Sequence, residues 1–379
     1  MNNYSVCVYP YGSEFEPVLK HSILIDESYE INGLISPRGW GLSGKEITIK
    51  QKSGSKVLTV LSSFADIRVE FNTIIVPDFD ISDQFTETVL RNIIEKVSTI
   101  RFLLWFPQLN LEQERRLNEA CHNANCFLGY YSKQSWTDDT LFCMENQDTE
   151  ELEECTVPTI AISGSWENTD KFEISLSLRD SFLNMGYRVS QIGSRNYCEL
   201  LGFHSFPIFM LNPGLDVVKK VILFNRYIKR LIDIENPDLL IVTIPGAISS
   251  YDSKFTNGFG ILPFLIFKAM TVDFHVSTVF YENITNEYIH LISDSCKYKF
   301  DSPVDCFHMT NMFINASESY ERKEIVTEKV SRKMVDDLLM CNNEKPVIPV
   351  MNLCRLDSID KLMGMVLCKL ADESVKIML

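Results

Sequence analysis

Apolar residues in the first third of the chain form short runs that alternate with segments of helical spacing. The short runs are rich in β-branched and aromatic side chains, as buried strands are. Two longer segments instead place apolar residues at i, i+3 and i+4, the spacing of an amphipathic helix. The strands are expected at residues 5–9, 31–35, 73–76, 101–106 and 126–130, and the helices at 85–97 and 111–123. Strands and helices in alternation predict an α/β domain with a mainly parallel sheet.

The same alternation returns from residue 157 onward. Strands are expected at residues 157–163, 187–192, 239–244 and 276–281, and helices at 171–185, 215–234 and 318–340. The aliphatic strand at 239–244 is typical of one buried on both faces of a parallel sheet. Asn110 and Gly186 mark helix boundaries, because an Asn side chain caps a first turn and a glycine ends a last one. The pattern therefore predicts a second α/β domain.

An acidic stretch separates the two patterns. Eight carboxylates lie between residues 138 and 154, and no apolar stripe accompanies them. A polar segment of this kind buries too little apolar surface to offset the entropy of ordering its backbone. We therefore expect one domain at residues 1–137, an acidic linker at 138–156 and a second domain at 157–379.

The charge balance excludes some classes of partner. Among 379 residues, 36 are Lys or Arg and 51 are Asp or Glu, so the formal net charge is −15. Such a chain is repelled by phosphate backbones and anionic lipids, and we expect no nucleic-acid or membrane partner. The longest uncharged stretch, 255–267, falls short of the ~20 apolar residues that span a bilayer. Eleven cysteines without a CxxC, and a start without a signal-peptide pattern, favour a cytoplasmic location.

The turn after the strand at 157–163 carries the most informative spacing. Six residues separate a glycine from a lysine that opens the next helix, and amides at a helix N-terminus together with a lysine can cradle phosphate. The turn is similar to the G-x6-K-T loop of dethiobiotin synthetases and their P-loop relatives, which implies a P-loop-like second domain and a nucleotide as candidate cofactor. The candidate cofactor-binding residues are Gly164, Ser165, Asn168, Thr169, Asp170 and Lys171, with Thr243 and Gly246 after the strand at 239–244.

Three positions depart from the P-loop pattern. Asp170 stands where those loops have glycine and would repel a phosphate, and Phe172 stands where they have the Ser or Thr that binds Mg²⁺. Thr243 takes the place of the aspartate on the metal side, and its neutral hydroxyl supplies no charge to hold a metal. Three interpretations stay open: an active P-loop, a degenerate loop that binds an anion or another ligand, and a plain turn capped by Thr169 or Asp170.

A glycine-rich loop follows the strand expected at 31–35. Its glycines permit a close approach of the backbone, and α/β sheets bind ligands at the carboxyl ends of their strands. The candidate ligand-binding residues are Arg38, Gly39, Trp40, Gly41 and Lys45, together with His204 further along the chain. The alternative is a glycine-rich turn in which Trp40 covers the edge of the sheet.

The sequence contains no recognisable metal or nucleophile motif. Cys121, His122 and Cys126 are close in sequence, but no second ligand pair stands at zinc spacing. Neither G-x-S-x-G nor HExxH occurs. We therefore assign no metal ligands and no catalytic residues.

Several stretches together resemble a family of peptide maturation system proteins. The family is encoded beside radical SAM enzymes in clostridial gene clusters for ribosomally made, modified peptides. The matching stretches are residues 8–11, 34–45, 170–173, 186–194, 202–207 and 237–241, with Pro245 and Gly246. The resemblance covers most of residues 1–260 and implies a role in producing a modified peptide, without assigned catalytic residues.

These expectations allow three functions for a Rossmann-like first domain joined to a degenerate P-loop-like second domain. The first is an accessory protein that binds a precursor peptide, a peptide-modifying enzyme, or both. The second is a nucleotide-dependent enzyme of the ligase or kinase type that acts on a peptide or small acid, with Lys171 on phosphate. The third is an assembly scaffold, and a homo-oligomer is compatible with each.

Overall fold

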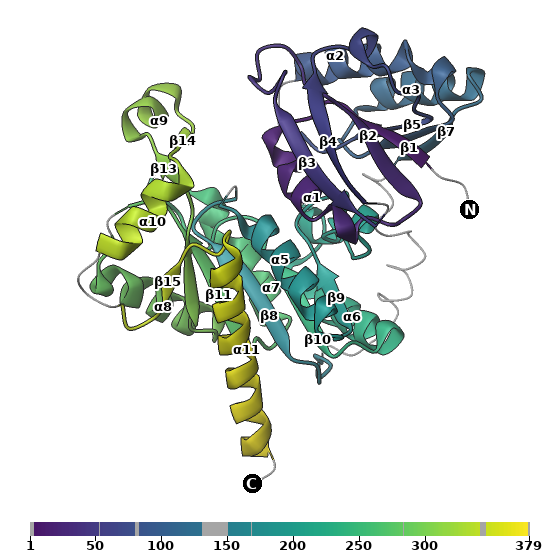
Figure 1. Cartoon of the computed structure of the whole chain (residues 1–379). Coiled ribbons are helices and arrows are strands. Elements are labelled where there is room, and N and C mark those ends of the chain that lie inside the picture. The colour runs from purple at the N-terminus through teal and green to yellow at the C-terminus, as the bar shows by residue number, and fades with distance from the viewer. Residues whose placement is uncertain are drawn as a thin grey trace. The chain divides into compact units, whose positions relative to one another are not determined.

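The computed structural model describes residues 4–52, 54–79, 83–130, 151–167, 169–282, 284–341 and 346–377 (Figure 1). The chain divides into two compact units. Unit 1 comprises Met1–Thr137 and Arg195–Ile208, and unit 2 comprises Asp138–Ser194 and Phe209–Leu379. Each unit holds a mainly parallel sheet flanked by helices, which confirms the predicted α/β class.

Unit 1 contains a seven-stranded sheet in the order β3-β4-β2-β1-β5-β6-β7. All neighbouring strands are parallel except β3 and β4. Without β3, the order by chain position is 3-2-1-4-5-6, that of doubly wound dinucleotide-binding folds. The strands are β1 (Tyr4–Val8), β2 (Tyr29–Ile35), β3 (Glu46–Gln51), β4 (Gly54–Leu61), β5 (Thr73–Val76), β6 (Phe102–Trp105) and β7 (Phe127–Tyr130). The Rossmann-like topology expected for the first domain is present.

The hairpin of β3 and β4 was not expected from the sequence. Most of its residues are exposed or half-buried, because the hairpin forms the edge of the sheet. An edge hairpin has few core positions, so its apolar pattern is weak.

Two long helices and several short ones pack around the sheet of unit 1. The longer pair, α2 and α3, packs Leu90 and Leu117 against Ile74 and Trp105 of the sheet. The predicted cap at Asn110 is confirmed, because its side chain and that of Gln113 form a reciprocal capping box. The helices are η1 (Ser13–Phe15), α1 (Glu16–Lys20), η2 (Ser22–Leu24), η3 (Phe64–Asp66), α2 (Asp83–Ile94), η4 (Val97–Thr99), α3 (Leu111–Asn123) and η6 (Cys198–Leu201).

Unit 2 contains a six-stranded, fully parallel sheet in the order β15-β12-β11-β8-β10-β9. The first strand, β8, lies in the middle, so the turn that follows it sits between the carboxyl ends of β10 and β11. The strands are β8 (Thr159–Gly164), β9 (Val189–Ile192), β10 (Leu239–Thr243), β11 (Phe274–Val279), β12 (Cys306–Met309) and β15 (Val350–Met351). This arrangement is the P-loop-like one expected for the second domain.

Helices cover both faces of the second sheet. On one face α5 and α11 pack Ile174 and Leu362 against Ile162 and Ile241, and Figure 1 shows α11 as the long yellow helix. On the other face Phe267 of α7 contacts His275 of β11. The helices are α5 (Lys171–Asn184), η7 (Ile208–Leu211), α6 (Val217–Glu235), η8 (Asn257–Gly260), α7 (Ile261–Lys268), α8 (Asn286–Phe300), α9 (Ala316–Arg322), α10 (Arg332–Cys341) and α11 (Leu356–Ile377).

The prediction of a single helix at residues 318–340 is wrong. α9 ends at Arg322, where Lys323 takes a left-handed conformation with φ of 59°. The chain then forms β14 (Thr327–Lys329), which pairs antiparallel with β13 (Met312–Ile314), before α10 begins. Ile325, Val326 and Thr327 are β-branched and favour a strand over a helix.

One segment groups with a different unit than its place in the sequence suggests. Residues 195–208, which we assigned to the second domain, belong to unit 1.

The described end of the expected acidic linker forms neither helix nor strand. The backbone N–H and carbonyl oxygen of Glu153 each form a hydrogen bond with the Asn225 side chain of α6. Residues 138–150 of that linker lie outside the described residues. Among the helices that are described, none has the length and apolar character needed to cross a membrane.

Candidate functional site

The loop after β8 is fixed to β11 through a glycine. A Cβ on Gly164 would lie 1.9 Å from the Thr278 hydroxyl, so this position requires glycine. The Thr169 hydroxyl lies 2.5 Å from the Thr278 hydroxyl and 2.9 Å from the Trp166 carbonyl oxygen. The Ser165 N–H donates to the Thr278 carbonyl oxygen. These bonds hold the loop over the carboxyl end of the sheet, while Asn168 lies outside the described residues.

Lys171 joins this loop to the end of β10. It is the first residue of α5 and is 3% exposed. Its ammonium donates to the carbonyl oxygens of Ile244 at 3.0 Å and Gly246 at 2.6 Å. The structure therefore brings together Lys171, Gly246 and the neighbouring Thr243, three residues that the sequence placed in one site.

Two side chains beneath α5 keep buried polar atoms without a partner among the described residues. The Thr243 hydroxyl and both amide atoms of Gln191 are fully buried and lack hydrogen bonds. Thr243 pairs with Ile162 and Gln191 with Ile241, so both side chains point to the face that α5 covers. Sequence reasoning missed Gln191. Its signal was a long polar side chain in an otherwise apolar strand.

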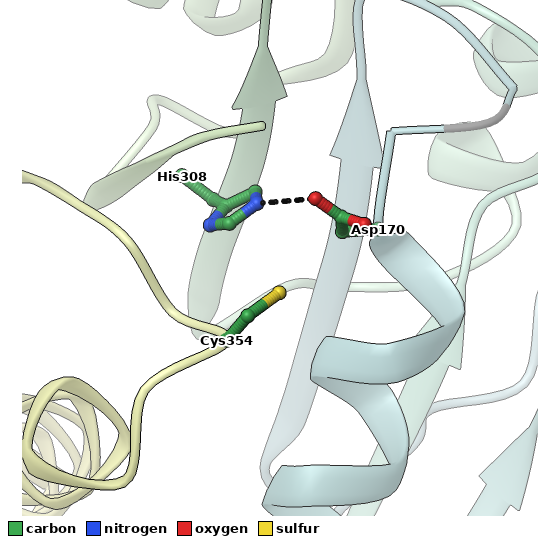
Figure 2. A group of neighbouring side chains, drawn as sticks. All are labelled: Asp170, His308 and Cys354. Atoms are coloured by element: carbon green, nitrogen blue, oxygen red, sulfur yellow. Dashed lines mark hydrogen bonds and ion pairs between the residues drawn. The ribbon is translucent and has the colours of Figure 1, made fainter. Parts of the chain in front are cut away.

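Asp170 turns its carboxylate away from Lys171 and toward β12. Asp170 precedes α5 with φ of 64°, a left-handed conformation that Asp tolerates better than most residues, and it makes no side-chain cap. Its Oδ2 accepts hydrogen bonds from His308 Nε2 at 3.1 Å and Thr310 Oγ1 at 2.8 Å, and Figure 2 shows the bond to His308. The negative charge that was expected to repel a phosphate is thus bound by other side chains.

The hydrogen bonds around His308 assign its proton. The Leu353 backbone N–H donates to Nδ1 at 2.9 Å, so Nδ1 carries the lone pair and Nε2 carries the hydrogen given to Asp170. Asp170, His308 and Cys354 place one ligand atom each within 4.8 Å of one another (Figure 2). A metal would need the Nε2 lone pair, and the Arg332 guanidinium 3.6 Å from Asp170 adds a positive charge. The cluster therefore fits a hydrogen-bond network better than a metal site.

The charges in this cluster favour an ionised Asp170 and a protonated Cys354. Burial opposes the ionised carboxyl, but His308, Arg332 and Thr310 together hold the pKa of Asp170 below its usual value. Burial and the carboxylates of Asp170 and Glu173 raise the pKa of the Cys354 thiol well above its ordinary value. Because the thiolate is the nucleophilic form, Cys354 is a poor nucleophile. The sequence analysis did not place His308, Arg332 or Cys354 beside Asp170.

A Ser–His pair lies on the opposite face of the same sheet. Ser163 Oγ is 2.7 Å from His275 Nε2, and His275 Nδ1 is 3.0 Å from the Ser302 carbonyl oxygen. Both residues are buried, at 0% and 1% exposure, and burial lowers the pKa of His275 to about 4. The pair is closed to a substrate and serves as a hydrogen-bonded part of the core.

The glycine-rich loop of unit 1 is a covering turn. Trp40 stacks on Phe85 of α2 and packs so closely on Gly12 that a Cβ there would lie 2.8 Å from its ring. Gly39 and Gly41 take positive φ angles, whereas the Arg38 and Lys45 side chains are exposed. The geometry agrees with the alternative in which Trp40 covers the sheet edge. His204 belongs to the segment Arg195–Ile208 of unit 1.

The segment Arg195–Ile208 lies at the carboxyl edge of the first sheet, where doubly wound sheets bind dinucleotides. The topological switch point of unit 1 lies between β1 and β5, and the residues after these strands include Glu14 and Asp78. Arg195 forms an ion pair with Glu14, and Asn196 donates to Asp78 through its backbone and side chain. Tyr197 is fully buried. Its ring packs against Phe15 and Phe106. The crevice is therefore occupied by the chain itself.

A cavity of about 190 Å³ lies elsewhere on unit 1. Its lining residues are Tyr4, Tyr29, Phe102, Leu104 and Phe127. Four of the five are the first residues of their strands. The cavity is thus at the amino ends of the strands, opposite to the edge where α/β sheets bind ligands.

Comparison with known proteins identifies a relative in fold only. A DUF1611 family protein from Anabaena variabilis has a crystal structure that matches with a TM-score of 0.60, at 12% sequence identity. The match covers 96% of this chain and 99% of that chain. No protein-family model matches the sequence, and no curated protein matches it. The chain is therefore similar to this DUF1611 protein in its α/β fold.

Proposed function

We propose that the protein is an accessory binding protein of peptide maturation that holds an anionic group at the carboxyl edge of the second sheet and does not hydrolyse nucleotides. The observation that carries the proposal is the buried ammonium of Lys171, which bonds the Ile244 carbonyl oxygen, together with the hydroxyl of the adjacent residue Thr243, which lacks a partner among the described residues. The peptide context comes from the family resemblance of residues 1–260.

The chemistry of this corner favours an anion. The N-terminus of the 14-residue α5 carries a partial positive charge, and the Lys171 ammonium adds a full one. An oxyanion would accept the Thr243 hydrogen, which otherwise stays buried and unbonded at a cost of roughly 1–3 kcal/mol. Asp170 does not oppose this, because its carboxylate is bound by His308 and Thr310.

The same corner lacks the groups that hydrolysis needs. Hydrolytic P-loops hold Mg²⁺ through a Ser or Thr after the lysine and an aspartate at the end of the neighbouring strand. Here Phe172 and Thr243 occupy these positions, and neither supplies a negative charge. An anion bound by this corner would therefore stay intact.

The test of the binding part uses Thr243→Val, which removes the unpartnered hydroxyl and keeps the shape. We expect inorganic phosphate, ATP or GTP to raise the melting temperature of the wild-type protein, as a ligand of the native state does. Thr243→Val should keep the melting temperature of the ligand-free protein and weaken phosphate binding about tenfold, the loss of one hydrogen bond to a charged acceptor. Lys219→Ala, on the exposed surface of α6, is the control for a general charge effect.

Two results would contradict the binding part and the absence of hydrolysis. Equal phosphate affinity in the wild type and in Thr243→Val would remove the anion site. Mg²⁺-dependent release of phosphate from ATP or GTP that Lys171→Ala abolishes would replace the proposal with an active nucleotide enzyme.

The peptide part has its own measurement. A fluorescently labelled precursor peptide should bind the full chain in an anisotropy titration, and phosphate should compete with it if an acidic side chain of the peptide is the anion. Binding without competition would place the peptide elsewhere on the protein. No binding at any phosphate concentration would remove the peptide role and leave the anion site standing.

A further inference from the structure

The end of α3 brings two cysteines together through its backbone. The Cys126 N–H donates to the Cys121 carbonyl oxygen at 2.9 Å, and the Asn125 N–H donates to His122 at 3.2 Å. Asn125 has a φ of 58°, in the left-handed region. These bonds define a Schellman motif, in which the residues at the positions of Cys121 and Cys126 contact each other through their side chains.

The geometry suits a disulfide between the two sulfur atoms. The Cys121 and Cys126 thiols interact through a side-chain hydrogen bond, and Cys126 Sγ also lies 3.8 Å from the Phe127 carbonyl oxygen. The 2.9 Å backbone bond and standard bond lengths keep the two Cα atoms within about 7 Å. Disulfides join Cα atoms up to roughly 6.8 Å apart, so little backbone movement is needed.

Cys126 is the better placed of the two for reaction with a molecule from solvent. It is 7% exposed, against 2% for Cys121, and its neighbours Asn125 and Phe127 are exposed. The hydrogen bond from Cys121 lowers the pKa of Cys126, although burial opposes this shift. A thiolate is the form that attacks a disulfide.

We propose that Cys121 and Cys126 form a thiol–disulfide modification site that reacts with low-molecular-weight disulfides. The Cys126 thiolate attacks one sulfur of the small disulfide, a mixed disulfide forms and the first small thiolate leaves. Cys121 loses its proton to solvent and attacks the Cys126 sulfur, which releases the second small thiolate. One small disulfide and two protein thiols thus become one protein disulfide and two small thiols.

The protein disulfide would fasten the end of α3 to the start of β7, in unit 1. This site is separate from the anion corner of unit 2, so it does not depend on the function proposed above. The plain alternative is that the two cysteines are only the apolar contact that often accompanies a Schellman motif.

The experiment treats the folded wild-type protein with oxidised glutathione, quenches it with acid, and alkylates the remaining thiols after denaturation. Trypsin releases residues 117–133 as one peptide with Cys121 and Cys126, and residues 1–20 as one peptide with Cys7. We expect the first peptide to lose two hydrogen atoms and to resist alkylation. Cys7, which is fully buried, should be alkylated as in the untreated protein.

Single substitutions separate the two roles. In Cys121→Ser, the mixed disulfide should persist and be found as glutathione on Cys126. In Cys126→Ser, Cys121 should stay unmodified. Circular dichroism of each variant shows whether it is folded, and the wild-type result stands without them. The proposal is overturned if both thiols of the wild type stay alkylatable at a glutathione disulfide concentration that modifies the exposed Cys341.

Discussion

The carboxyl edges of the two sheets are closed by different means. In unit 1, a segment of the chain fills the crevice between β1 and β5, and the Tyr197 ring is buried there against two phenylalanines. In unit 2, Asp170 and Lys171 close the edge through hydrogen bonds, and the Thr243 hydroxyl below them has no described partner. Where a packed segment fills the edge, no hydrogen-bonding group is left for a ligand. Where polar side chains close the edge, their donors can form hydrogen bonds with a ligand instead.

The largest expected effect tests the packed edge. Tyr197→Ala should lower the free energy of unfolding by about 4 kcal/mol, because a buried aromatic ring leaves a cavity between Phe15 and Phe106. Tyr197→Phe keeps the ring but removes the hydroxyl that bonds the Glu14 carbonyl oxygen, and should cost about 1 kcal/mol. Urea denaturation measures both. Equal losses for the two variants would show that polar bonds, rather than packing, hold the segment.

The second effect tests the hydrogen-bonded edge. Asp170→Ala should lower the free energy of unfolding by about 3 kcal/mol, since it leaves the buried His308 and Thr310 side chains without their shared acceptor. Asp170→Asn keeps an acceptor and the tolerance for positive φ, so it should recover about half of the loss. A loss below about 1 kcal/mol for the alanine variant would mean that the cluster adds nothing to the closure of the edge.

The third effect is a pH dependence that separates the edge from the core beneath it. His275 has a folded pKa of about 4, below its ordinary value, so protons favour the unfolded chain. The free energy of unfolding should have its full value above pH 6.5 and should fall by about 2–3 kcal/mol as the pH drops toward 4. The nearby charges, Asp305 and Lys369, shift this pKa in opposite directions. The Asp170 carboxyl, whose pKa is lowered, should lose its contribution only below about pH 4.

Substitution of His275 tests whether this residue causes the loss of stability between pH 6.5 and 4. Unfolding free energies from urea titrations at several pH values should show the loss between pH 6.5 and 4 in the wild type. His275→Gln, which keeps an acceptor for Ser163, should remove most of it. An unchanged slope in this variant would assign the transition to another group.

The smallest effect gives the energy scale for an exposed ion pair between two helices of unit 1. Arg116 of α3 lies 2.7 Å from Glu87 of α2, and both side chains are more than a third exposed. Arg116→Ala should cost about 0.5 kcal/mol, and less at high salt. If this loss equals that of Asp170→Ala in the same urea assay, burial adds nothing to the strength of the Asp170 cluster.

Local spacing in the sequence was enough to find one half of the site in unit 2. Gly164, Lys171, Thr243 and Gly246 follow strands whose apolar runs were evident, and a parallel sheet brings the carboxyl ends of adjacent strands together. The helix boundaries at Asn110 and Gly186 were also found, because capping depends on a few neighbouring residues.

The other half of the site depends on which strands are neighbours, and local spacing does not specify this. His308, Thr310 and Cys354 reach Asp170 only because β12 lies between β11 and β15. The segment Arg195–Ile208 was misplaced for a related reason, since no periodicity shows that a chain will leave one unit and pack into another. The helix expected at 318–340 was wrong because its charged residues suit a helix as well as exposed turns.

The two consecutive residues at the start of α5 also bear on the order of folding. Lys171 bonds Ile244, 73 positions away and just after β10, and Asp170 bonds His308, 138 positions away in β12. These two strands lie on opposite sides of β8 within the sheet. Closing such long loops costs entropy before any contact is gained, so these bonds form after the local helices and after β8 has met its neighbours. We therefore expect the turn before α5 to form late and to open early. Weakening it should speed unfolding and leave the folding rate nearly unchanged.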